Sequence, residues 1–177
     1  MRVIFLLCVV LIVSACDGNT PLMEASIDGS QERISSLLES GTDVNQKNNY
    51  GWTALSHAAR NGRFEVAKFL IEKGADVNAV DETGWTPLIR AAQKGQTKVV
   101  KLLIESGADV NAANHDGWTA LMWASLREKL KTVKYLVTVK GINLNHQSKD
   151  GRSAIMISIT ENNNDILIVL QDAGAKP

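Results

Sequence analysis

The side chains that could perform chemistry are few and lie far apart in the chain. Three histidines are spread along it: His57, His115 and His146. None has a second metal-binding side chain at the spacing that a zinc site needs, so we expect no metal site. The sequence contains no glycine-rich phosphate loop and no Gly-x-Ser-x-Gly nucleophile motif. We therefore expect no catalytic residues, no cofactor and no small-molecule substrate, and the protein is predicted not to be an enzyme.

Cys16 is the one side chain whose surroundings favour covalent chemistry. It closely follows an apolar run over residues 3–13, which is preceded by the positively charged Arg2. The run is too short to span a bilayer as a helix, which takes about 20 residues. This layout is typical of a secretory signal peptide, so residues 1–15 are predicted to be one. A short uncleaved membrane anchor is the alternative.

Residues 13–16 read Val-Ser-Ala-Cys and resemble the lipobox of bacterial lipoproteins. The resemblance implies cleavage before Cys16 and thioether attachment of a diacylglycerol, and two or more acyl chains anchor a protein stably. It also implies the periplasmic side of a bacterial cell envelope, with Asp17 favouring the inner membrane. Cleavage would remove Cys8, so no disulfide could form within the mature chain. The alternative is an ordinary signal peptide with a chance cysteine.

The rest of the chain is an internal repeat. A Thr/Ser-Pro/Ala-Leu/Ile marker recurs at spacings of 33, 33, 33 and 34, beginning at Thr20, Thr53, Thr86, Thr119 and Ser153. A hydroxyl at this point caps a helix, and Pro or Ala suits the first helical position. Gly29, Gly62 and Gly95 are predicted to end the first helices of the first three repeats, and Gly74 and Gly107 to end the second helices of the second and third. Three aspartates recur with the repeat and are predicted to structure its loops: Asp43, Asp76 and Asp109.

Residues 84–112 (GWTPLIRAAQKGQTKVVKLLIESGADVNA) resemble an ankyrin repeat. The resemblance implies an all-α solenoid of about five helix-loop-helix repeats with β-turn fingers, in which neighbours bury each other's apolar faces. A single domain over 16–177 is expected, with repeats near 17–48, 49–80, 81–113, 114–147 and 148–177. Glu128 replaces the inter-helix glycine of the fourth repeat, and an extra residue follows near 137–141, so a local distortion is expected there.

In this family, partners usually meet the concave face formed by the fingers and the first helices. Trp52, Trp85 and Trp118 recur there every 33 residues and are predicted to form a ladder that anchors a protein partner. The alternative is that these indoles pack on one another and stiffen the fingers. Further predicted contact residues flank them: Tyr50, Arg60, Asn61, Gln93, Lys94, His115 and Arg127. Trp123 is expected in the core.

A second surface is predicted at the C-terminal end. Lysines occupy equivalent outer positions of the second helices: Lys68, Lys101 and Lys134. The last repeat has Ile168 there, within the apolar run 166–170. Since terminal repeats normally present a polar outer face, Ile168 and Val169 are predicted to self-associate or to meet a partner. The alternative is that the run packs inward and frays.

The charge balance narrows the function further. The chain has 19 basic and 19 acidic side chains, and this neutrality argues against binding to nucleic acid. The leading interpretation is a periplasmic, membrane-tethered module that binds and supports or protects a partner protein. The alternative is an immunity protein that neutralises a toxin or enzyme. An exported effector is disfavoured by the lipobox. Binding specificity in such a scaffold depends on surface side chains, so the sequence does not identify the partner.

Overall fold

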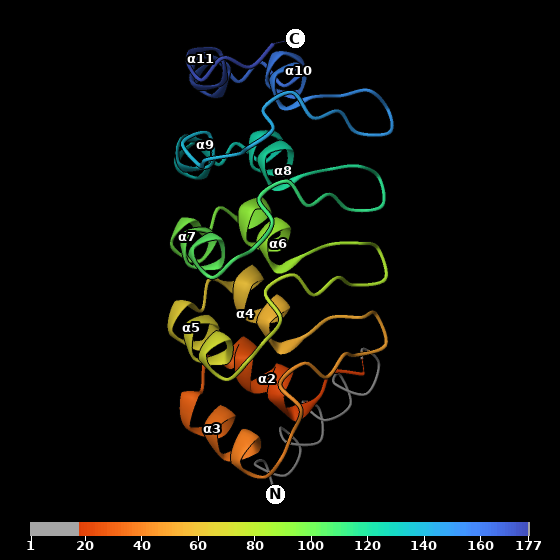
Figure 1. Ribbon diagram of the computed structural model, residues 1–177, viewed down its shortest axis with the longest axis vertical. Coiled ribbons are helices and arrows are strands. Elements are labelled where there is room, and N and C mark those ends of the chain that lie inside the picture. The colour runs from red at the N-terminus through yellow and green to blue at the C-terminus, as the bar shows by residue number, and fades with distance from the viewer. Residues whose placement is uncertain (1–17, 177) are drawn as a thin grey trace, which may run out of the picture.

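The computed structural model describes residues 18–176, and within them the chain forms five helix pairs stacked in one row (Figure 1). The first helices of the pairs are α2 (Pro21–Asp28), α4 (Ala54–Asn61), α6 (Pro87–Lys94), α8 (Ala120–Leu126) and α10 (Ala154–Thr160). The second helices are α3 (Gln31–Glu39), α5 (Phe64–Glu72), α7 (Thr97–Glu105), α9 (Leu130–Leu136) and α11 (Asn164–Asp172). The connections between pairs project to one side as fingers. One pair falls within each predicted repeat, and we number the pairs as units one to five.

The predicted hydroxyl caps start all five first helices, and the predicted glycines end α2, α4 and α6. In the third unit, the Thr86 hydroxyl accepts a hydrogen bond from the Ile89 backbone N–H at 3.2 Å, and Gly95 ends α6 with a φ of 74°. The same side-chain cap opens the first helix of every unit. The capping prediction is confirmed, because each hydroxyl satisfies a backbone donor that the helix leaves unpaired.

The fourth unit is altered where the sequence departs from the repeat. Glu128 takes the left-handed backbone of the missing glycine, with a φ of 57°, and the turn between the helices is kept. Both helices of this unit are shortened to seven residues. The extra residue is absorbed by turns after α9, in which Thr138 N–H donates to the Tyr135 carbonyl at 3.0 Å. The distortion is therefore confined to helix ends.

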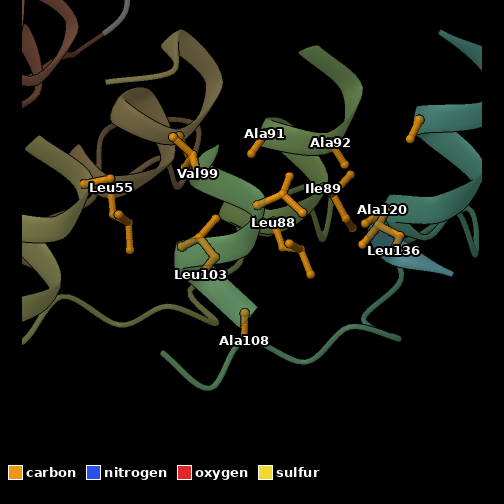
Figure 2. Close-up of a cluster of buried hydrophobic side chains, with 14 of the residues drawn as sticks. Leu55, Leu88, Ile89, Ala91, Ala92, Val99, Leu103, Ala108, Ala120 and Leu136 are labelled. Carbon is orange, nitrogen blue, oxygen red and sulfur yellow. The ribbon is translucent and has the colours of Figure 1, made fainter. Parts of the chain in front are cut away.

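The hydrophobic core runs along the stack between neighbouring units. Leu88, Ile89 and Leu103 of the third unit are fully buried against the units on either side (Figure 2). Ala91 and Ala92 are also fully buried, and their small side chains let the first helices approach closely. Because each unit supplies only part of the cover for its neighbours, the units stabilise one another along the row.

A ladder of asparagines joins the loops of successive units. Asn78 accepts from the Asp109 backbone N–H at 2.9 Å and donates to the Gly107 carbonyl at 3.2 Å. Asn45 and Asn111 make the equivalent bonds to the units that follow them. The Asp109 carboxylate in turn accepts from the Asn111 N–H at 2.9 Å. The loop-structuring role predicted for the recurring aspartates is confirmed.

Adjacent fingers are joined through their backbones. The Thr83 carbonyl accepts from the His115 N–H at 3.0 Å, and the same type of bond links the Tyr50 carbonyl to the Glu82 N–H at 3.1 Å. Gly84 lies at this junction with a φ of 79°, and a Cβ there would lie 2.8 Å from the His115 nitrogen. Glycine is required at this tip both for its backbone conformation and for the close approach of the next finger.

Candidate binding groove

A groove of about 890 Å³ lies over the fingers and first helices of the second and third units and extends to the turn between α8 and α9 of the fourth unit. We call it the concave groove. Seven of the ten predicted contact residues line it: Tyr50, Trp52, Arg60, Trp85, Gln93, Lys94 and Arg127. The finger side chain of Tyr50 is 52% exposed, whereas the indoles of Trp52 and Trp85 are half-buried. The repeat period therefore brings residues from three separate units onto one continuous surface.

The floor of the groove is a row of stacked side chains. The Arg90 guanidinium lies between two indoles, with its central carbon 3.9 Å from the ring centroid of Trp52 and 4.2 Å from that of Trp85. Arginine over an indole face is a favourable cation–π contact. At one end of the row the ring of His57 lies 4.8 Å from that of Trp52.

The row continues beyond Trp85 into the fourth unit. The Trp123 ring lies 4.7 Å from that of Trp85 and 4.9 Å from that of Trp118. The Arg152 guanidinium then lies 4.7 Å from the Trp118 ring centroid. The three finger tryptophans therefore do not stack directly on one another. Arg90 lies between Trp52 and Trp85, and Trp123 lies between Trp85 and Trp118, so finger and helix side chains alternate along the row.

This interleaving includes residues that the sequence analysis missed or placed in the core. His57, Arg90 and Trp123 recur every 33 residues on the first helices, and that spacing was the signal that could have found them. Trp118 is only 7% exposed, so the structure does not present it as a broad contact surface. Its ring is in contact with both Trp123 and Arg152.

An ion pair fixes the centre of this row. Asp81 lies at the base of the third finger, where its carboxylate accepts from the backbone N–H of Thr83 at 2.8 Å and of Trp85 at 3.0 Å, and from the Arg90 guanidinium. Its side chain is 3% exposed and that of Arg90 is 14% exposed. Burial raises the pKa of Asp81, but these hydrogen bonds outweigh burial and hold the pKa below its ordinary value. Both side chains are therefore charged and held in place at neutral pH.

Three predicted contact residues lie outside the groove. The Asn61 amide donates to the His57 carbonyl of its own helix at 2.8 Å, and His115 lies at a finger tip. Trp118 lines a separate hollow of about 420 Å³ beside the fourth and fifth fingers. Cys16 and Asp17 lie outside the described residues.

At the C-terminal end, Ile168 is 54% exposed and Val169 is half-buried. Ile159 is 49% exposed at the helix position where Ala59 and Ala92 are fully covered by the following unit. Ile159 is thus exposed at the position that a following unit covers in the second and third units. Ile168 instead lies on the outer row of the second helices, at the position of Lys68 and Lys101.

Residues 18–176 contain no cluster of His, Cys, Asp or Glu side chains that could hold a metal ion. None of the helices described in that range has the length and apolar character needed to cross a membrane.

Three stretches of the chain, residues 3–81, 22–114 and 112–177, match the family model described as Ankyrin repeats (3 copies). The chain belongs to the ankyrin repeat family. The all-helical stack agrees with this assignment, and the fold prediction is confirmed. The ankyrin stack is a protein–protein interaction module. No curated protein matches the chain.

Proposed function

We propose that the protein binds a partner protein in the concave groove while a lipid on Cys16 tethers it to the periplasmic side of a bacterial membrane. The observation that carries the binding site is the prearranged row of Trp52, Arg90 and Trp85 on the groove floor. Side chains fixed before binding lose little conformational freedom in the complex. Partly exposed tryptophans with polar side chains around them are typical of binding hot spots.

The groove suits an extended protein segment better than a small molecule. Small-molecule pockets are mostly enclosed and lined by apolar side chains. This groove is open along three units, and most of its lining side chains are polar or charged, including Arg60, Gln93 and Lys94. A partner segment lying across the fingers would contact successive units in turn.

Site-specific photocrosslinking tests the groove. A photoreactive phenylalanine analogue at Gln93, within the groove, is compared with the same analogue at Lys101, on the outer face of α7 in the same unit. In the native cells, we expect the Gln93 probe to capture one protein that the Lys101 probe does not. Capture of the same protein from Lys101 alone would contradict the proposed site.

The tether is proposed from the lipobox-like residues 13–16. Labelled palmitate should enter the native protein and the protein should sediment with membranes, whereas Cys16→Ser should abolish the label. A label that persists in the Cys16→Ser variant would exclude lipidation at this residue.

Two roles for the partner are compatible with this proposal. The module supports or protects a partner enzyme, or it neutralises a toxin. Once the crosslinked protein is identified, its activity and heat inactivation are measured with and without the purified module. Slower inactivation supports the first role, and inhibition supports the second.

A further inference from the structure

We infer that the concave groove takes an acidic segment of the partner protein, an inference that rests on the function proposed above. The groove lining contains five cationic side chains and two carboxylates. Arg90 and Asp81 neutralise each other on the floor, which leaves Glu82 as the remaining acid. The other cations surround the floor: Arg60, Lys94, Arg127 and Lys129.

These cations are available to a partner. The ion pairs formed within residues 18–176 involve none of the four side chains. Arg60, Lys94 and Arg127 are exposed, and Lys129 is half-buried. The guanidinium carbons of Arg60 and Arg127 lie 5.7 and 5.8 Å from the ring centroids of Trp52 and Trp123, beside the stacked row.

The positive excess is local to this groove. The whole chain is neutral, so the rest of the molecule carries a compensating negative excess. The neighbouring hollow beside Trp118 contains two acids and two cations: Asp116, Asp150, Lys149 and Arg152. A third hollow, beside the inter-helix turns of the last two units, has acids as its only charged residues: Glu128, Glu161 and Asp165. The surface therefore favours acidic groups in the concave groove and disfavours them at the turns between the paired helices of the last two units.

Helix stability alone does not account for this arrangement. A cation in the last turn of a helix is favoured by the helix dipole, and Arg60 and Lys94 lie in the last turns of α4 and α6. In the first and fifth units, the first helices end instead at acidic residues, Asp28 and Glu161. The cations thus follow the extent of the groove and not a requirement of each helix end.

The indoles on the groove floor set a second requirement for the segment that binds there. Trp52 and Trp85 are half-buried indoles beside the cations, so apolar side chains placed between the acidic ones would contact them. A nucleic acid is disfavoured because its binding depends on neutralising many phosphates along an extended basic surface. An acidic peptide segment with interspersed apolar residues meets both requirements.

Fluorescence anisotropy with labelled peptides tests the inference. The probes are a short glutamate-rich peptide with interspersed leucines, a lysine-rich peptide of the same length and leucine content, and oligothymidylate. The variant Lys94→Glu with Arg127→Glu reverses two groove charges. Its matched control, Lys98→Glu with Lys131→Glu, makes the same charge change on exposed positions of α7 and α9 in the same units. Thermal unfolding confirms that each variant is folded.

We expect the glutamate-rich peptide to bind more tightly than the other two probes and to weaken as salt rises. The groove variant should lose about tenfold in affinity, and the control variant should stay within about twofold of the native protein. Equal binding of the acidic and basic peptides, preference for oligothymidylate, or equal losses in both variants would overturn the inference. If the Gln93 probe captures a partner while the peptides show no charge preference, only this inference fails. If the Lys101 probe alone captures the partner, the proposed function fails with it.

Discussion

The third and fifth units share one sequence pattern but provide different environments. Gly84 of the third finger touches the backbone of the next finger, whereas a Cβ at Gly151 of the fifth would meet nothing within 4 Å. Ala92 is fully buried beneath the following unit, whereas Ile159, at the same helix position, is 49% exposed. In a stack, the neighbouring unit decides whether each repeated position is covered or exposed, so the closest packing lies between the central units, where the proposed groove also lies.

The largest expected effect on stability is the difference between substitutions of Gly84 and Gly151, the equivalent glycines of the third and fifth fingers. Gly84→Ala and Gly151→Ala both force alanine into a left-handed backbone, which costs roughly 1–2 kcal/mol. Gly84→Ala also places a methyl group 2.8 Å from the His115 nitrogen, so its total loss of unfolding free energy should be about 3 kcal/mol. Urea denaturation monitored by circular dichroism measures both losses. Equal losses would show that the fingers do not pack as described.

The next effect concerns the ion pairs of the same two units. Asp81→Asn leaves the half-buried Arg90 without its carboxylate and should lower stability at pH 7 by about 2 kcal/mol. Asp150→Asn, the matched control, breaks an exposed pair with Arg152 and should have little effect. Chemical denaturation at neutral pH compares the two variants with the native protein.

The Asp81 pair also predicts a pH dependence. Because the folded-state pKa of Asp81 lies below its ordinary value, its contribution is complete above about pH 4 and is lost as pH falls through the folded-state pKa. The native protein should therefore lose more stability than Asp81→Asn as the pH falls below about 4. Identical acid profiles would show that Asp81 is not stabilised by its partners.

The smallest expected effect concerns the C-terminal unit. Ile159 and Ile168 are about half exposed, so the protein should self-associate weakly through this end. Light scattering in detergent-free solution should show a mass that rises with concentration, and Ile159→Lys with Ile168→Lys should remove the rise. Lys68→Ala, on the polar outer row of the second unit, serves as the control. A strictly monomeric native protein would exclude self-association.

The repeat units and their caps could be predicted from the sequence because each depends on residues within one turn of a helix. Thr86 and Gly95 reveal the start and end of α6 through local backbone chemistry. The groove floor could be predicted only in part. The finger tryptophans have a visible period, but the contacts of Trp85 with Arg90 and Trp123 depend on side-chain direction across two units.

The burial of Trp118 could not be predicted from the residues next to it in the sequence. It depends on Arg152, which comes from the next finger, and on Trp123, which the sequence placed in the core. The left-handed backbone of Glu128 is a similar case, because the packing of the fourth unit imposes a conformation that its side chain disfavours.

The affinity of the captured partner for Trp52→Ala with Trp85→Ala tests the binding groove most directly. Circular dichroism and thermal unfolding establish that the variant is folded, and Trp118→Ala, which removes a buried indole outside the groove, is the control. If the partner binds in the groove, the double variant should lose at least about tenfold in affinity. Trp118→Ala should lose stability but little affinity. Unchanged affinity in a folded double variant would contradict it.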